Sequence, residues 1–267
     1  MRTPLRSQPL SDNLARPWTR LSLVEQTRST NEDMVRAAAA GEAEPWTALV
    51  TQHQSGGRGR LGRTWTTEPG TALTFSALVP TPADPSWSPL LAGLAVADTI
   101  SDLYGFPVPL KWPNDVLAGV VDGAGGQAGR KLAGILCELT PVGVVVGIGL
   151  NVDQAAEELP VPTATSLRIL AGAHPEGLTR EGLLLGLLDR LASTLGEWAA
   201  DPDRVRDEYR RRCRTIGRDV RVDSRGVGGA VRVGRALEVD PDGRLVVRFD
   251  DEVVALSAGD VTHVRET

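Results

Sequence analysis

Apolar residues recur along the chain with two periods, one typical of helices and one typical of strands. A spacing of about 3.6 residues, with capping residues at the segment ends, predicts helices. We expect them at 29–41, 88–105, 178–200 and 202–215. Short runs rich in Val, Leu and Thr predict strands, at 46–52, 71–79, 108–112, 130–139 and 143–152, the last two forming a hairpin. Because helices and strands are interleaved without strict alternation, the pattern favours the α+β class.

The two ends of the chain differ from this central region. Residues 1–20 contain prolines and little periodicity, so we expect a loose lead-in. After about Gly217, short strand-like runs alternate with turn signals such as Pro-Asp-Gly at 241–243. This pattern predicts a small antiparallel barrel, and we therefore divide the chain into domains 1–216 and 217–267.

Composition narrows the class of protein. Of 267 residues, 41% are hydrophobic and 24% charged, which is typical of globular domains, and the net charge of −5 disfavours a chain that coats a polyanion. Two cysteines, Cys137 and Cys213, are too few for a disulfide framework or a zinc cluster, and the three histidines share no metal-ligand spacing. No apolar run approaches the ~18–20 residues of a membrane span, so we expect a cytoplasmic protein.

Lysine is almost absent from the chain. Of the 29 basic residues 27 are arginine, and only Lys111 and Lys131 are lysine. Either these two occur by chance, or they stand where a compact ammonium group is required instead of a planar guanidinium. Lys111 precedes Pro-Asn-Asp and Lys131 follows a glycine-rich segment, so neither lies on a predicted helix face. Both are candidate site residues.

The segment GGRGRLGRTW, residues 56–65, combines glycines, arginines and a tryptophan. Glycines let backbone N–H groups approach a ligand closely, and Arg58, Arg60 and Arg63 carry forked donors suited to carboxylate or phosphate oxygens. Trp65 offers a face to a heteroaromatic ring. By itself the segment is compatible with an anion cradle, a nucleic-acid contact or a plain basic turn. It matches neither the Walker pattern nor the dinucleotide-binding fingerprint.

Five segments together carry a specific resemblance. In chain order they are STN (29–31), Q.GGRGRLGRTW (54–65), KWPNDV (111–116), RKLAGIL.E (130–138) and GIGLNV (147–152). This ordered set resembles the catalytic domain of biotin protein ligases, and the likeness runs from about residue 22 to the C-terminus. It implies a class II synthetase-like mixed β-sheet with flanking helices, followed by a small SH3-like β-barrel.

The resemblance also implies a two-step reaction. Biotin and ATP, with Mg²⁺ carried mainly by the ATP phosphates, give biotinyl-5′-AMP and pyrophosphate. A lysine of a biotin carboxyl carrier protein of an acyl-CoA carboxylase, such as acetyl-CoA carboxylase, then takes the biotinyl group. No DNA or membrane partner is implied, the protein ligands of Mg²⁺ are unknown, and both a monomer and a homodimer stay open.

Site residues follow from the resemblance position by position. The implied biotin-binding set is Ser29, Thr30, Asn31, Gln54, Arg58, Gly59, Arg60, Lys131 and Gly134. The implied ATP or adenylate set is Arg58, Arg60, Arg63, Trp65, Asn114, Lys131 and Asn151. The implied catalytic set is Lys131, Arg58, Asp115 and Lys111, with Asp115 orienting or deprotonating the attacking amine. Cationic groups are what the first step requires, because it forces a carboxylate and a phosphate together.

The sequence departs from the family pattern in three places. Gly56 stands where alanine is usual, and the connection 118–129 is longer than the usual short turn. Because only 28 residues precede Ser29 in this sequence, we do not expect the DNA-binding helix-turn-helix of repressor-type members. The glycines of 56–65 and 118–129 suit loops that close over a reactive adenylate.

Two other functions stay open. A lipoate– or octanoate–protein ligase has a related fold and also modifies a carrier lysine. A nucleic-acid-binding module would use the 56–65 segment and the terminal barrel. The net charge and the lack of aromatic residues within a basic stripe disfavour this second alternative.

Overall fold

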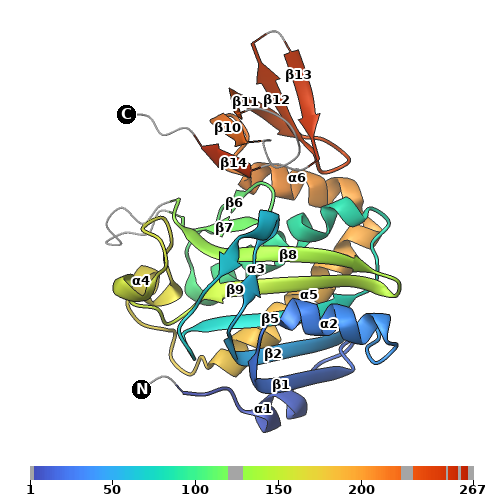
Figure 1. The fold of residues 1–267 in the computed structure, drawn as a ribbon, viewed down its shortest axis with the longest axis vertical. Coiled ribbons are helices and arrows are strands. Elements are labelled where there is room, and N and C mark those ends of the chain that lie inside the picture. Colours follow the sequence, from blue (N-terminus) through green and yellow to red (C-terminus); the bar gives the residue numbers. More distant parts are fainter. Residues whose placement is uncertain (1–2, 120–128, 224–230, 251, 258–259, 264–267) are drawn as a thin grey trace.

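The computed structural model describes residues 3–119, 129–223, 231–250, 252–257 and 260–263. Its main layer is a seven-stranded sheet in the order β1-β2-β5-β9-β8-β7-β6 (Figure 1). In that order the strands span Arg20–Thr27, Thr47–Gln54, Ala72–Val79, Gly143–Asn151, Lys131–Thr140, Asp115–Leu117 and Leu110–Lys111. β1 and β2 are parallel and every other neighbouring pair is antiparallel. The predicted mixed sheet of an α+β fold is therefore confirmed.

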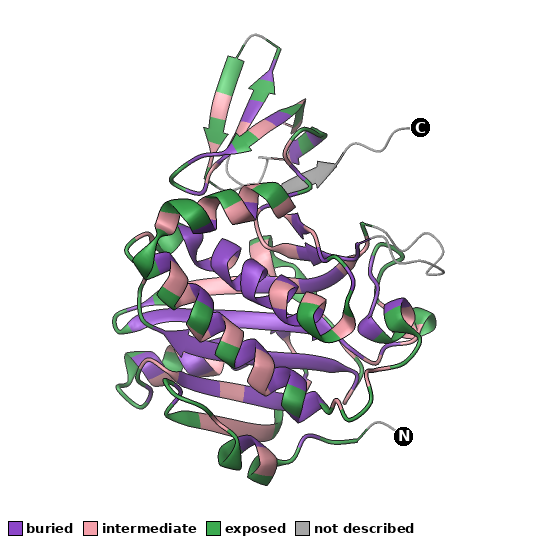
Figure 2. Ribbon diagram, turned by 180° about the vertical axis from the view of Figure 1, so that it is seen from behind, coloured by how far each residue is buried: buried purple, intermediate pink, exposed green. Residues whose placement is uncertain are grey.

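Helices cover both faces of this sheet (Figures 1 and 2). α2 (Thr30–Ala39) lies on one face, whereas α3 (Ser88–Tyr104) and α5 (Arg180–Ala200) pack together on the other. Because both faces are covered, the central strands β5 and β9 are buried along their whole length. Among the described residues, no helix is both long enough and apolar enough to cross a membrane.

The helix ends follow the signals in the sequence. The Ser29 hydroxyl oxygen accepts a hydrogen bond from the backbone N–H of Glu32 and so begins α2. Thr179 caps α5 in the same way, and α3 ends at Gly105, which has the left-handed φ of 72°. The fourth predicted helix is α6 (Pro202–Arg212). The predicted helices and strands are thus confirmed, although β6 is only two residues long.

The prediction of a loose lead-in at 1–20 is wrong. Ser7–Asp12 forms a short helix, α1, because Leu5, Leu10 and Trp18 are buried against the main core. The sequence pattern also does not predict β1, an edge strand whose residues are half-buried or exposed. The loop expected at 118–129 falls mainly on 120–128, outside the described residues.

The C-terminal region forms a second, antiparallel sheet in the order β13-β12-β11-β10-β14. Its strands span Glu252–Leu256, Leu245–Phe249, Val231–Val239, Asp219–Asp223 and Asp260–His263. This arrangement is consistent with the small SH3-like domain expected from the sequence. The sheet lies beyond α6 at one end of the molecule (Figure 1), and the boundary between residues 216 and 217 stays a prediction.

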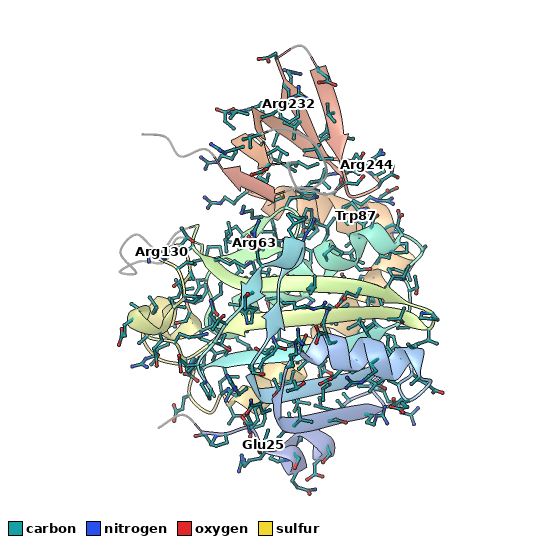
Figure 3. The ribbon with its side chains drawn as sticks, viewed as in Figure 1. Glu25, Arg63, Trp87, Arg130, Arg232 and Arg244 are labelled. Carbon is teal, nitrogen blue, oxygen red and sulfur yellow. The ribbon has the colours of Figure 1, made fainter. Side chains whose placement is uncertain are left out.

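The Pro-Asp-Gly turn between β11 and β12 joins the two sheets. The Pro241 carbonyl accepts a hydrogen bond from the Trp87 indole at 2.8 Å, and the Gly243 carbonyl accepts one from the Trp112 indole at 2.9 Å. Both tryptophans are buried, and Trp87 lies below the C-terminal sheet in Figure 3. Gly243 has a φ of 76°, and a Cβ there would lie 3.2 Å from the nearest side-chain carbon. The turn therefore docks closely against Trp87 and Leu90 near the start of α3, and it also binds Trp112.

Replacing Trp112 with phenylalanine should weaken this junction. The Gly243 carbonyl would lose its donor, and leaving a buried carbonyl unpaired costs about 1–3 kcal/mol of unfolding free energy. Urea titration measures this loss. Trp198→Phe is the matched control, because Trp198 is similarly buried and its indole N–H has no partner among the described residues. Equal losses in the two variants would show that the hydrogen bond contributes nothing.

Candidate active site

A cavity on the α2 face of the main sheet brings the predicted residues together. Its floor is formed by β8 and β9, and its walls by the first turn of α2, the β6–β7 turn and residues 56–65, here called the arginine-glycine loop. Arg63 of this loop lies toward the end of the main sheet that faces the C-terminal sheet (Figure 3). The predicted residues that line the cavity are Ser29, Thr30, Asn31, Gln54, Arg58, Gly59, Arg60, Arg63, Trp65, Lys111, Asn114, Asp115, Lys131 and Gly134.

The floor of the cavity is a patch of sheet without side chains. Gly134 of β8 is paired with Gly149 of β9, and Gly147 lies two residues away on the same face. The Trp65 indole lies directly on this patch. A Cβ at position 149 would be 2.4 Å from the ring, and one at position 134 would be 3.1 Å from it. The close approach of the ring therefore requires glycine at position 149.

A set of hydrogen bonds forms the polar end of the cavity. Gln54 Oε1 accepts from the backbone N–H of Thr30 at 2.9 Å and from its hydroxyl at 3.2 Å. The Ser76 hydroxyl lies 2.8 Å from Thr30 Oγ1 and 2.6 Å from Asn31 Oδ1. Asn31 Nδ2 in turn donates to Glu138 Oε2 at 2.8 Å. These buried polar groups are thus held in place by one another and by the fold.

Asp115 holds both lysines of the chain at the other end of the cavity. Its carboxylate oxygens lie 2.5 Å from Lys131 Nζ and 3.4 Å from Lys111 Nζ. Burial alone would raise the pKa of Asp115, but the two ammonium groups, Lys131 foremost, outweigh burial and lower this pKa below its usual range. Asp115 is therefore a carboxylate at neutral pH.

Strand register brings these residues together from distant parts of the sequence. Lys111 pairs with Asp115 across β6 and β7, and Asp115 pairs with Gly134 across β7 and β8. Asn114 fastens the connecting turn to β8, because its Nδ2 donates to the Ile135 carbonyl at 2.7 Å and its own carbonyl accepts the Ile135 N–H at 3.0 Å. The sheet itself therefore sets the position of Asp115.

The arginine-glycine loop is a short hairpin over the cavity. β3 (Gly57–Arg58) pairs with β4 (Thr64–Trp65), and a 3-10 turn at Arg60–Gly62 connects the two. Leu61 and Gly62 have φ values of 56° and 73°, which reverse the chain within a few residues. The Arg58 guanidinium forms ion pairs with Glu32 at 3.2 Å and Glu138 at 3.1 Å. The hairpin is thus held from below by Trp65 and from the side by Arg58.

Asn151 is the predicted residue that the structure places outside the cavity lining. Its Nδ2 donates to the Thr165 carbonyl at 2.9 Å, and its Oδ1 accepts from Gln154 at 3.0 Å. The backbone of Thr163 and Thr165 pairs with that of Lys131. Asn151 therefore supports the segment that borders Lys131, and the structure does not bring it together with the other predicted residues.

Sequence reasoning misses several residues of the site. Gly147, Gly149 and Phe75 line the cavity, and Ser76 and Glu138 bond its polar end. The alternate glycines of an otherwise apolar strand were an available signal for the floor. Glu138 is the last residue of the motif RKLAGIL.E, although the sequence assigns it no role, and Ser76 carries no local signal, because its partners come from another element.

The described residues contain no group of three or more His, Cys, Asp or Glu side chains that can hold a metal ion. Among the described residues that line the cavity, Asp115 is the one carboxylate, and both lysines already pair with it. The described part of the cavity therefore combines a preformed polar end, an uncharged flat floor and a cluster of cations.

Comparison with known proteins agrees with this arrangement. Residues 23–154 match the model of the biotin/lipoate A/B protein ligase family. The chain is 39% identical to the biotin–[acetyl-CoA-carboxylase] ligase of Mycobacterium tuberculosis, with 99% of this chain and 98% of that protein covered. It is 26% identical to the bifunctional ligase/repressor BirA of Bacillus subtilis, over 87% of this chain and 71% of that protein.

A solved structure gives the same fold. The biotin protein ligase of Aquifex aeolicus, in complex with biotin and ATP, superposes with a TM-score of 0.75 at 26% identity, covering 93% of this chain and all of that one. Fold and site thus define a protein of the biotin- and lipoate-ligase class. From its identity over nearly the whole length of the mycobacterial enzyme, the chain belongs to the biotin protein ligase family.

A methyl group at position 149 should displace Trp65 from the cavity floor. In Gly149→Ala the new Cβ would take the place of the ring, so we expect greater quenching of tryptophan fluorescence by acrylamide in a folded protein. Gly186→Ala is the control, because its Cβ would meet only Thr99 Cγ2 at an ordinary 3.6 Å. Unchanged quenching in Gly149→Ala would contradict the contact between the ring and the glycines.

Asp115→Asn should destabilise the protein in a pH-dependent way. Because the pKa of Asp115 is lowered by folding, its carboxylate stabilises the fold above its unfolded pKa of about 3.9, and this contribution is lost as the pH falls through the folded pKa. Denaturant titration should therefore show a less stable variant at neutral pH and a shrinking difference in strong acid.

Asp189→Asn is the control for this titration. Burial raises the pKa of Asp189, so its charge opposes folding at neutral pH and the substitution should not destabilise the protein. A difference between Asp115→Asn and the parent that does not change with pH would contradict the lowered pKa of Asp115.

Proposed function

We propose that this protein is a biotin–protein ligase that activates biotin with ATP and transfers the biotinyl group to a lysine of a biotin carboxyl carrier protein. The observation that carries the proposal is the meeting of four distant segments, 29–31, 54–65, 111–115 and 131–134, around one cavity. The bound biotin and ATP of the Aquifex aeolicus ligase support the same assignment.

The polar end and the floor of the cavity suit the two halves of biotin. We assign the ureido group to the polar end, where the Thr30 hydroxyl and the Gln54 amide are already held in fixed positions. The apolar ring edge and side chain of biotin would lie beside the Trp65 ring, which covers the glycine floor. Preorganised polar groups beside a flat apolar surface favour binding of a ligand that has both features.

In the first step, a carboxylate oxygen of biotin attacks the α-phosphorus of ATP. The bond from that phosphorus to the bridging oxygen breaks, and pyrophosphate leaves with the electron pair. Both reactants are anionic, so the step needs positive charge at their meeting point. We assign this role to Lys131, Lys111 and Arg60, which all line the cavity. Holding both reactants in one cavity also removes much of the entropic barrier.

In the second step, the Nζ of the carrier lysine attacks the carbonyl carbon of biotinyl-5′-AMP. The bond from carbon to the phosphate oxygen breaks, AMP leaves with its electron pair, and the nitrogen releases one proton to the solvent. A carboxylate with a lowered pKa is a weak base for an ammonium group. We therefore assign to Asp115 the orientation of Lys131 and of the incoming amine, with the amine entering in its neutral form.

The nucleotide would occupy the side of the cavity formed by Trp65, Arg63 and Asn114. The Trp65 indole N–H is buried there without a hydrogen-bond partner among the described residues, which leaves one donor for a ligand. Since the lining holds a single carboxylate that is already paired with two lysines, we propose that Mg²⁺ enters bound to the phosphates of ATP. We place the reaction in the cytoplasm.

The direct test is a mass measurement on an apo-carrier domain incubated with the protein, Mg²⁺ and ATP. We expect a mass increase of one biotinyl group that requires both ATP and biotin. The same mixture with lipoate in place of biotin separates the two branches of the family. Modification with lipoate alone would overturn the assignment to biotin.

Lys131→Ala should abolish biotin-dependent exchange of pyrophosphate into ATP, because it removes the cation nearest to Asp115 and the cavity floor. We expect a loss of at least about a hundredfold, the range for one electrostatic donor at a reacting centre. Arg130→Ala is the control, since Arg130 is the neighbouring cation on the chain and does not line the cavity. Near-normal exchange in Lys131→Ala, or full activity in Lys131→Arg, would contradict a specific role for the ammonium group.

A further inference from the structure

The Arg58 side chain is directed to two carboxylates from different elements. Its Nε lies 3.2 Å from Glu32 in the first turn of α2, and one terminal nitrogen lies 3.1 Å from Glu138 on β8. All three side chains are partly buried, with exposed fractions of 44% for Arg58 and 30% for each glutamate. The guanidinium therefore bridges two rigid elements at the rim of the cavity.

The Arg58 guanidinium already has acidic partners on two sides. It faces the carboxylates of Glu32 and Glu138, and Glu32 also lies 3.6 Å from the Nε of Arg28. An anionic ligand that used the Arg58 side chain would therefore have to displace acidic partners that are already in place. Lys131 and Lys111, by contrast, share a single carboxylate and leave positive charge in the cavity. The Arg58 side chain is thus better placed to hold the arginine-glycine loop than to contact a phosphate.

Glu138 also belongs to the polar end of the cavity. While Oε1 accepts from Arg58, Oε2 accepts from Asn31 Nδ2 at 2.8 Å. Asn31 Oδ1 lies 2.6 Å from the Ser76 hydroxyl, which also contacts Thr30. A continuous set of hydrogen bonds thus runs from Thr30 and Asn31, which we assign to biotin, through Glu138 to the arginine-glycine loop.

We propose that Glu138, assisted by Glu32, is a positioning residue that fixes the arginine-glycine loop over the cavity through Arg58. The inference rests on the proposed function and deepens it: Glu138 links the residues assigned to the biotin ring with the loop that covers the adenylate. In this arrangement the loop carries its backbone amides and Arg60 to the reactants, and the Arg58 side chain anchors it.

The first test does not depend on the enzymatic activity of the protein. Trypsin cuts after arginine, and the loop contains Arg58, Arg60 and Arg63, so limited proteolysis of the ligand-free protein followed by mass spectrometry reports how often the loop leaves the cavity. Glu138→Gln keeps the shape of the side chain and removes its charge. We expect cleavage within the loop to become about two- to fivefold faster, the range for loss of one partly exposed ion pair, with global stability unchanged.

Glu197→Gln is the matched control. Glu197 pairs with Arg204 at 2.7 Å on the helical side of the molecule, with a similar exposed fraction. In Glu197→Gln, trypsin should cleave the arginine-glycine loop at the same rate as in the parent protein. Glu32→Gln should accelerate cleavage as Glu138→Gln does, and the double variant should exceed either one. Loop cleavage in Glu138→Gln at the rate of the control would overturn the proposal.

The second test separates positioning from a general structural role. In Glu138→Gln we expect the KM for biotin and the rate of adenylate release to rise several-fold while kcat changes less, and Glu138→Asp, which keeps the charge, should recover part of the loss. A fall in kcat alone, with unchanged KM and loop cleavage, would contradict the proposal. If the parent protein failed to biotinylate a carrier, the proteolysis result would still decide whether Glu138 holds the loop.

Discussion

The arrangement of the site depends on one close contact, that of the Trp65 indole with the paired glycines of β8 and β9. A Cβ at position 149 would coincide with the ring, so the contact exists only because both strands lack side chains there. Trp65 ends β4, and its contact therefore fixes the hairpin that carries Arg60 over the cavity. The same contact places the ring 5.7 Å from Lys131 Nζ. One strand pair thus positions both the flat floor and the cationic end.

Charge is balanced differently at the two ends of the cavity. At the reacting centre two lysines share the Asp115 carboxylate, and positive charge remains for two anionic reactants. At the rim two glutamates hold the Arg58 guanidinium, and one of them, Glu32, also pairs with Arg28, so the charges there balance. Anions are therefore attracted to the end of the cavity where the reaction needs them, whereas the anchor of the loop does not compete for them. Net negative charge at the reacting centre would instead repel both anionic reactants.

Much of this site is predicted through the family resemblance, which five short motifs of the sequence carry. Ser29 begins the predicted helix 29–41 and caps it in the structure, and the only two lysines of the chain both lie on Asp115. What sequence cannot supply is the choice of partner across strands. Ser76 looks like an ordinary strand residue, and Glu138 is a motif residue without a predicted partner, until the fold brings both to Asn31. Asn151, by contrast, is predicted as a site residue, but its amide is directed to Thr165 and not into the cavity.

The C-terminal sheet is part of the scaffold of the active site for a physical reason. β6 and β7 carry Lys111 and Asp115 but contain only two and three residues, and such a short edge pair has little stability of its own. Its outer side is fastened by the end of α6 and the following residues: Arg214 N–H donates to the Leu110 carbonyl at 2.8 Å, and Trp112 N–H donates to Thr215 Oγ1 at 3.1 Å. The Trp112 indole then reaches the Gly243 carbonyl of the C-terminal turn. Asp115 is therefore held between β8 on one side and the C-terminal region on the other, so the geometry of the two lysines depends on both sheets.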